Sequence, residues 1–329
     1  FTTAYEIGST VRGATLLTGY REGAVTIGTS QIDEPIVLGE NLVKSSIFNR
    51  SGRIRMDDLM ALEQSSNVYM FKIAMTMGGL SYYPYIGIAS LLRDDTLQRL
   101  RNGYAQVGLG VPTGIDLPGE TAGVIGVPDS PGKVLDITIG QFDTYTPLQL
   151  VQYVSTIANG GYRVQPRLLK EIRKPSKDGQ MLGPLVEEIK PKILNRLDNT
   201  QDEIDRVREG FRRVYYGARG TARSNFANTA YTAAGKTGTA EVVYFGPQKD
   251  RYGTNTINLV HVGFAPFDKP EVAYAVVIPW ASINLSPSVY YNNTIARQAL
   301  DKYFELKTIY QSEGVTDSVV GQKIIRQTD

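Results

Sequence analysis

Three short segments carry side chains that could act on one substrate together. The first begins at Ser9 and has Arg12 three residues later. Because a helix brings residues three apart onto one face, these two side chains would lie about 5–6 Å apart. A serine hydroxyl is a poor nucleophile until a neighbour takes its proton, and a helix N-terminus offers free N–H groups to a developing oxyanion. Taken alone, Ser9 is more simply explained as an ordinary N-cap after Gly8.

The second segment is Ser65-Ser66-Asn67, in the run from Glu63 to Met70 at a junction between two helical stretches. The Ser65 hydroxyl could relay a proton, and the Asn67 amide could hold a substrate carbonyl. Taken alone, so short an S-x-N pattern is better explained as a polar helix junction.

The third segment is Lys236-Thr237-Gly238-Thr239, at the start of a predicted strand. Lys236 offers positive charge to an anionic carboxylate, and the two threonines offer hydroxyls. Gly238 has no side chain, so another part of the chain could approach the strand closely there. An exposed strand edge could also hydrogen-bond a peptide-like substrate. Taken alone, an edge strand made of Lys and Thr explains the segment equally well.

Composition narrows the possible functions. With 329 residues, 42% of them hydrophobic, the chain can bury a substantial core. The 35 basic and 33 acidic side chains nearly cancel, which argues against a nucleic-acid binder. There is no Cys, and His261 is the one histidine, so thiolate and multi-histidine metal sites are excluded, and a Ser-His-Asp triad would have to use His261. We predict neither a metal nor an organic cofactor.

The elements that must position these segments follow from periodicity and from Gly and Pro breaks. Residues 21–54 are predicted to form a surface excursion, 108–132 a loop, and 163–195 short strands around the turn Lys177-Asp178-Gly179. Thr200 and Glu203 form a capping box. The helix that follows should bury Ile204, Val207, Phe211 and Val214. Other helices are predicted over 9–20, 56–77, 88–102, 146–159 and 290–306.

Strands are predicted over 232–243, 258–265 and 272–278, and their short connections favour an antiparallel sheet. A helix-rich part followed by a strand-rich part is typical of an α+β fold. The longest apolar run, Val272 to Trp280, is too short to span a bilayer. The chain begins abruptly at Phe1, so we expect it to be a fragment whose leader or anchor lies upstream.

In order and context, the three segments resemble the S-x-x-K, S-x-N and K-T-G signature of penicillin-binding proteins and serine β-lactamases. The resemblance runs from about residue 4 to about residue 300 and is greatest to the class B, monofunctional transpeptidases. Its flanking landmarks are Tyr5 to Ser9, Gln141 with Thr146 to Leu150, Asn159-Gly160-Gly161, Gly220-Thr221-Ala222 and Val262 to Pro266.

The resemblance implies an antiparallel sheet flanked by helices plus an all-helical subdomain. We therefore expect one transpeptidase domain over 1–329, incomplete at its N-terminus. Residues 21–220 would form the helix-rich part with the S-x-N segment, and residues 221–306 the sheet part with the K-T-G strand. Family members are held at the outer face of the bacterial plasma membrane by an upstream helix, which would lie outside this sequence.

The resemblance also implies a reaction and its partners. Such a serine attacks the penultimate D-Ala carbonyl of a peptidoglycan stem peptide, D-Ala leaves, and an amine of a neighbouring stem resolves the acyl-enzyme. β-Lactams mimic D-Ala-D-Ala and acylate the same serine, and partners in a cell-wall synthesis complex are expected. By this resemblance Ser9 is the nucleophile, and the backbone N–H groups of Ser9 and Thr239 form the oxyanion hole. Ser65 and Lys236 would pass a proton to the leaving nitrogen. Asn67 would hold the acyl side-chain amide, and Thr237 and Thr239 would hold the terminal carboxylate.

Position 12 departs from the family pattern. The family has Lys there, and its neutral amine is commonly assigned as the base for the serine. Arg12 is effectively always protonated and cannot play that part, although a fixed cation could still lower the pKa of the serine. We therefore expect slow acylation or none.

Three other interpretations stay open. A serine β-lactamase shares the signature but must activate a water, for which Glu120 is the one candidate carboxylate. A non-catalytic β-lactam sensor or scaffold with a degenerate site would account for Arg12. An unrelated peptide-binding module would require the three segments to coincide by chance.

Overall fold

The central element is a three-stranded antiparallel sheet. It is seen in a computed structural model that describes residues 1–39, 42–92, 95–176, 182–283 and 289–312. Its strands are β9 (Ala234–Val243), β10 (Asn255–Ala265) and β11 (Val272–Ser282), in the order β11-β10-β9. All three predicted strands are confirmed, and β10 and β11 extend beyond the predicted limits. The K-T-G segment therefore lies in β9, which forms one edge of this sheet.

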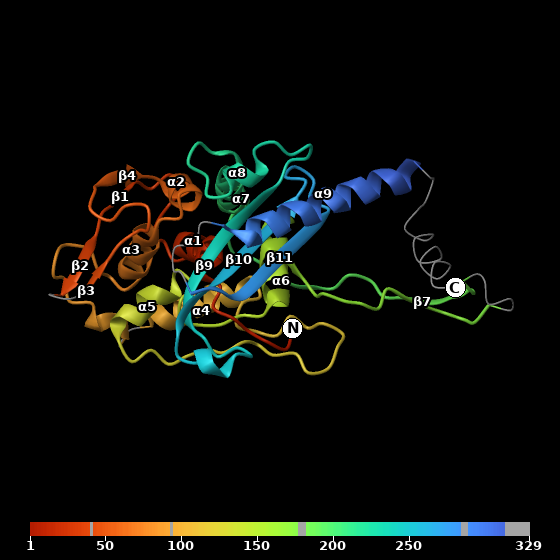
Figure 1. The fold of residues 1–329 in the computed structure, drawn as a ribbon, viewed down its shortest axis with the longest axis horizontal. Helices are drawn as coiled ribbons and strands as arrows, with labels where there is room; N and C mark the ends of the chain where they lie inside the picture. The colour runs from red at the N-terminus through yellow and green to blue at the C-terminus, as the bar shows by residue number, and fades with distance from the viewer. Residues whose placement is uncertain (40–41, 93–94, 177–181, 284–288, 313–329) are drawn as a thin grey trace.

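Helices cover both faces of this sheet (Figure 1). Because side chains alternate along a strand, Val260, Val262 and Phe264 face a core that they share with α1 (Arg12–Arg21) and α6 (Pro147–Ala158). The other face packs against the end of α7 (Gln201–Tyr216), α8 (Arg223–Phe226) and α9 (Tyr291–Ser312). The predicted α+β class, an antiparallel sheet flanked by helices with a helix-rich part beside it, is confirmed.

Helix starts that the sequence marks with capping residues lie where they were predicted. Thr146 and Gln149 form a capping box at the start of α6, and Thr200 and Glu203 form one at the start of α7. The predicted apolar face of α7 is fully buried. Its members are Ile204, Val207, Phe211 and Val214.

The helix predicted over 56–77 is not continuous, because the chain breaks into α2 (Asp58–Glu63) and α3 (Asn67–Met77). The junction between two helical stretches that was predicted at Ser65-Ser66-Asn67 is confirmed. Ser65 has a positive φ of 63°, which a helix cannot contain. The Ser66 hydroxyl then accepts from the backbone N–H of Tyr69 at 3.0 Å and caps α3. The break places the S-x-N segment at the junction of two helices.

Residues 21–54, which were predicted to form a surface excursion, are mostly exposed or half-buried but also contain short strands. This stretch contains β1 (Gln31–Asp33), β2 (Ile36–Gly39) and β3 (Leu42–Lys44); β1 pairs with β4 (Ile54–Met56), and β2 pairs with β3. Asp33 is buried, and its carboxylate accepts hydrogen bonds from Ser46, Asn49 and Ser66. These bonds tie the stretch to the start of α3, so it forms part of the surroundings of the S-x-N segment.

The remaining elements refine the predicted limits. The helix predicted over 88–102 is a 3₁₀ turn, η2 (Ala89–Leu92), followed by α4 (Thr96–Gln106), and α5 (Pro131–Ile137) follows the predicted loop. Short strand pairs form between β5 (Tyr162–Val164) and β8 (Ile193–Arg196), and between β6 (Glu171–Arg173) and β7 (Leu185–Glu188). A 3₁₀ turn, η3 (Lys249–Arg251), lies between β9 and β10.

The predicted turn at Lys177-Asp178-Gly179 lies outside the described residues. The division at residue 220 stays a prediction. Within the described ranges, no helix combines the length and the apolar character that crossing a bilayer requires.

Candidate active site

Ser9 lies beside the K-T-G strand because glycines allow two backbones to touch. Ser9 belongs to a 3₁₀ turn, η1 (Gly8–Val11), that leads directly into α1. A Cβ at Gly238 would lie 2.5 Å from the carbonyl oxygen of Ile7, and a Cβ at Gly8 would lie 2.3 Å from that of Thr239. Gly8 also has a positive φ of 53°, which favours glycine. The close approach predicted at Gly238 is therefore made by the segment that carries Ser9.

The interpretation of Ser9 as an ordinary N-cap does not hold. Ile7 occupies the N-cap position of η1, and no side chain caps this turn. Ser9 is half-buried, and its hydroxyl makes no hydrogen bond to another described residue. This hydroxyl is therefore free to face a substrate.

The three sequence segments meet at the hydroxyl of Ser65. Arg12 donates from Nη1 to Ser65 Oγ at 2.6 Å, and Lys236 Nζ lies 2.9 Å from the same oxygen. Arg12 also donates from Nη2 to the Asn67 side-chain oxygen. Residues from α1, the α2–α3 junction and β9, far apart in sequence, thus form one contact network.

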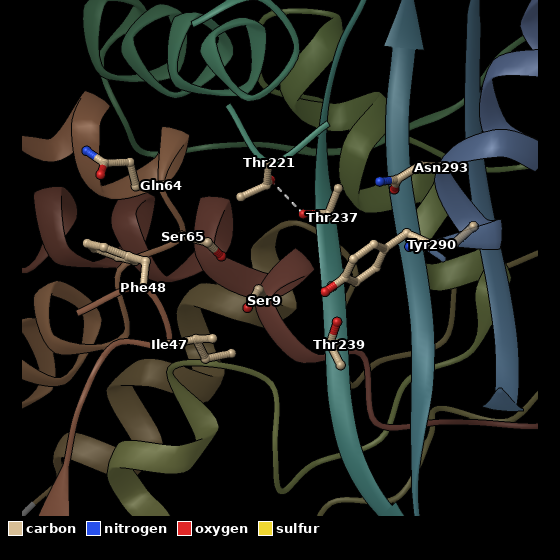
Figure 2. Close-up of a pocket in the computed structure, with 12 residues that line it drawn as sticks. Ser9, Ile47, Phe48, Gln64, Ser65, Thr221, Thr237, Thr239, Tyr290 and Asn293 are labelled. Atoms are coloured by element: carbon tan, nitrogen blue, oxygen red, sulfur yellow. Dashed lines mark hydrogen bonds between the residues drawn. The ribbon is translucent and has the colours of Figure 1, made fainter. Parts of the chain in front are cut away.

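A pocket of about 280 Å³ opens over this network. Ser9, Ser65, Thr237, Gly238 and Thr239 all line it, and Figure 2 shows Ser9 between Ser65 and Thr239. Thr237 and Thr239 are two apart on β9 and therefore point to the same side of the strand. A second hollow of about 510 Å³ shares Ser9 and Thr239 with the first. Ser9 thus lies where the two hollows meet.

The two basic side chains of the site are almost completely buried, Arg12 at 1% and Lys236 at 0% exposure. Burial lowers the pKa of Arg12 to about 9, while the nearby Asp33 carboxylate raises it, so the guanidinium keeps its proton at neutral pH. Burial, and then the positive charge of Arg12, hold the pKa of Lys236 well below its usual value. Arg12 Nε is buried and has no partner among the described residues.

Several residues of the site were not predicted as site residues. Thr221 lines the pocket, and its hydroxyl lies 2.8 Å from that of Thr237. The segment Gly220-Thr221-Ala222 had been noted as a family landmark, which is the signal that could have found it. Asp33 carries no such signal, because only the tertiary structure brings it near Arg12. The pocket is also lined by Ile47, Phe48, Gln64, Tyr290, Asn292 and Asn293.

His261 and Glu120 have structural partners instead of catalytic ones. His261 is buried, its Nδ1 lies 2.9 Å from Asn293 Oδ1, and its Nε2 lies 2.6 Å from the Tyr215 hydroxyl. With both nitrogens occupied, the ring has none left for a triad with Ser9. The Glu120 carboxylate accepts from Thr113 and Gly114 and lines neither hollow at Ser9. Among the residues that the structure describes, no cluster of three or more acidic or histidine side chains could hold a metal ion.

The fold and this convergence of S-x-x-R, S-x-N and K-T-G agree with the class of serine acyltransferases that the three segments resemble. The chain belongs to the family described as the penicillin binding protein transpeptidase domain, whose profile matches residues 1–302. This confirms the family membership that the three segments predicted.

Individual relatives agree with this assignment. The chain is 44% identical to penicillin-binding protein 2A of Bacillus subtilis (strain 168) over 313 residues, covering 95% of this chain and 43% of that protein. It is 27% identical to peptidoglycan D,D-transpeptidase MrdA of Haemophilus influenzae over 321 residues, covering 91% of this chain and 44% of that protein. The solved structure of penicillin-binding protein 2B from Streptococcus pneumoniae (strain R6) matches with a TM-score of 0.84 and 32% identity, covering 92% of this chain and 48% of that one.

Proposed function

We propose that this chain is the peptide cross-linking domain of a class B penicillin-binding protein and acts through a covalent acyl-enzyme on Ser9. The chain spans less than half the length of the relatives it matches, 43% of one and 44% of another. The observation that carries the proposal is the meeting of Arg12, Ser65 and Lys236 beside the pocket that Ser9 lines. The proposed donor substrate is a stem peptide that ends in D-Ala-D-Ala, and β-lactams are the proposed covalent inhibitors.

In the proposed reaction, Ser9 Oγ attacks the penultimate D-Ala carbonyl, and the backbone N–H groups of Ser9 and Thr239 hold the oxyanion. Ser65 and Lys236 return a proton to the leaving nitrogen, and terminal D-Ala departs. An amine from a second stem then attacks the ester carbonyl, which forms the cross-link and frees Ser9.

Binding groups for the donor peptide surround the nucleophile. Thr237 and Thr239 would hold the terminal carboxylate, and the edge of β9 can pair with an extended peptide. Asn67 Oδ1 already accepts from Arg12, and its Nδ2 donates to the Ser45 carbonyl at 2.9 Å. The second hydrogen on Nδ2 is the one that would reach the acyl side-chain amide.

The experiment is acyl transfer from a model peptide. The protein is incubated with a pentapeptide ending in D-Ala-D-Ala and with a D-amino acid acceptor, and released D-Ala and the exchanged peptide are quantified. We expect both products, and neither from Ser9→Ala. Ser224→Ala, on the exposed surface of α8, is the matched control and should behave like the parent. Product formation that survives Ser9→Ala would overturn the proposal.

A second candidate is a sensor or scaffold with a degenerate site, and Arg12 is the observation that favours it. A guanidinium cannot accept the serine proton, and Arg12 Nε lacks a partner among the described residues. Penicillin acylation without transfer to an amine would indicate a sensor, and absence of both would indicate a scaffold. A serine β-lactamase would turn over nitrocefin repeatedly, whereas a transpeptidase is acylated and then stalls.

Location and partners follow only from the family and stay proposals. The proposed site of action is the outer face of the bacterial plasma membrane, with a cell-wall synthesis complex as the proposed partner. Cell fractionation of the full-length protein and co-purification would test these two points.

A further inference from the structure

The Ser65 hydroxyl lies between two buried basic side chains, and this arrangement restricts where protons can be. Arg12 Nη1 approaches Ser65 Oγ at 2.6 Å and Lys236 Nζ at 2.9 Å. A guanidinium has five N–H donors and no acceptor, so it can only donate. Ser65 Oγ must therefore accept from Arg12, and the hydrogen of Ser65 is free to point toward Lys236.

The buried negative charge near this hydroxyl is not enough to stabilise two cations. Among the described residues, the carboxylate that acts on Arg12 is Asp33, which is itself buried. The charged group that acts on Lys236 is Arg12, and it repels a proton there. An isolated buried charge is very costly unless it is paired, so one of the two basic groups is neutral. Arginine holds its proton far more tightly than lysine, which makes Lys236 the neutral one.

Among the described residues, the neighbouring side chains of β10, α7 and η1 supply no compensating negative charge to Lys236. On β10, His261 is neutral because burial lowers its pKa to about 3. On α7, burial raises the pKa of Tyr215 far above its usual value, so its hydroxyl is also neutral. The turn η1 consists of Gly8, Ser9, Thr10 and Val11, none of which titrates. The neutral amine can donate one hydrogen to the Thr237 carbonyl at 3.1 Å and keep its lone pair for the Ser65 hydroxyl.

We propose that the Lys236 amine, acting through the Ser65 hydroxyl, takes the proton of Ser9 in this chain and so replaces the base that an arginine at position 12 cannot provide. The proposal rests on the proposed function, because it concerns the acylation step of that same site. In this proposal Arg12 is a fixed cation that orients Ser65 and Asn67 and disfavours protonation of Lys236.

The step balances without a co-reactant. As Ser9 Oγ bonds to the substrate carbonyl carbon, its proton moves to Ser65 Oγ, the Ser65 proton moves to Lys236 Nζ, and the carbonyl π electrons move to the oxygen. When the oxyanion collapses, the bond from carbon to nitrogen breaks. The leaving nitrogen then takes the proton back from Lys236 through Ser65, which leaves a neutral amine again.

The test is a square of four proteins: the parent, Arg12→Lys, Lys236→Arg, and the double variant Arg12→Lys/Lys236→Arg. Second-order rates of acylation by a fluorescent penicillin are measured for each, with thermal melting as the check on folding. Lys249→Arg, on the exposed η3 turn, is the matched control for the exchange of a lysine for an arginine.

The four proteins distinguish between two roles of Lys236, as a proton acceptor and as a charge that only helps to bind the substrate. Lys236→Arg alone places a permanent cation in β9 and leaves no amine in the site, so acylation should fall about 10²–10⁴-fold, the usual contribution of a general base. In the Arg12→Lys background an amine is present again, and the same exchange should cost at least tenfold less. Equal losses in both backgrounds would show that Lys236 acts as a charge and would overturn the proposal.

If arginine is too large for the buried position 236, a pH profile and a second substitution at this position still provide an independent test. Acylation of the parent should rise with pH to a plateau as Lys236 loses its proton, and Lys236→Met should remove this rise. A parent that is not acylated while Arg12→Lys is acylated would overturn this proposal and leave the proposed function standing. Absence of acylation in both would overturn the proposed function as well.

Discussion

At Ser65, one hydroxyl joins three segments that lie far apart in the sequence. The Arg12 side chain reaches this oxygen from α1 and the Lys236 side chain reaches it from β9, and both side chains are almost completely buried. In such a site burial decides which of the two basic side chains carries a proton. Whether each position holds Arg or Lys therefore determines which side chain can accept a proton.

Arg12→Lys is the direct test of the departure from the family pattern. It returns an amine to the position three residues after the nucleophile and removes the buried Nε, which lacks a partner among the described residues. We expect penicillin acylation to rise, but by less than the about 10²–10⁴-fold that a general base contributes, because Lys236 already serves as a base in the parent. Stopped-flow fluorescence with a labelled penicillin measures it, and equal rates in the two proteins would contradict the expectation.

His261 should make stability depend on pH. Its pKa is lowered to about 3 in the folded chain, first by burial, against an ordinary value of 6.5. The unfolded chain then binds the extra proton, so stability is lost as pH falls from 6.5 toward 3. The free energy of unfolding therefore falls by about 2 kcal/mol between pH 7 and pH 5.

Urea unfolding of the parent and of His261→Gln at both pH values isolates this contribution. The variant lacks the titrating ring, so its stability should change about 2 kcal/mol less between the two pH values. The same pH dependence in both proteins would show that the ring is not the group that titrates.

At the scale of elements, two glycines fix the distance between the η1 turn and β9. Gly238 has no room for a side chain, since a Cβ there would lie 2.5 Å from the Ile7 carbonyl oxygen and 2.9 Å from Thr10 Cγ2. The contact positions Ser9 against the strand that carries Thr237 and Thr239, so the backbone sets the geometry of the proposed nucleophile and the proposed binding groups together.

Gly238→Ala should therefore push η1 away from the strand. We expect a loss of about 1–3 kcal/mol in stability from overpacking and a larger loss in acylation, because Ser9 moves relative to Thr239. Gly87→Ala is the control, since a Cβ there meets nothing within 4 Å. Melting temperature and acylation rate are measured for both variants. Unchanged acylation in Gly238→Ala would refute the positioning role of this contact.

Local signals explain which elements could be predicted from the sequence. Thr146 followed by Pro147, and the capping box of Thr200 and Glu203, are local signals of a helix start, so the starts of α6 and α7 were predicted closely. The break at Ser65 depends on a positive φ, which no hydrophobic period reveals. The position of Asp33 depends on hydrogen bonds to Ser46 and Ser66, which are tertiary contacts.

At the scale of the whole molecule, the three motif segments were predicted to meet, and the structure brings Arg12, Ser65 and Lys236 together. The walls of the pocket were not predicted. Tyr290 and Asn293 come from the region where α9 begins, and Phe48 comes from the stretch before β4 (Figure 2). Such residues carry no motif, and only the tertiary fold brings them to the pocket.

The central claim is that the hydroxyl of Ser9 reacts where the three segments meet. The measurement is intact-mass analysis after incubation with a penicillin, followed by trypsin digestion and sequencing of the modified peptide. Trypsin cuts after Arg12, and no Lys or Arg lies between Phe1 and Arg12, so the peptide that ends at Arg12 contains Ser9. The account predicts a single adduct of the mass of the penicillin on Ser9 in this peptide. An adduct on any other residue, or no adduct after Arg12→Lys, would contradict it.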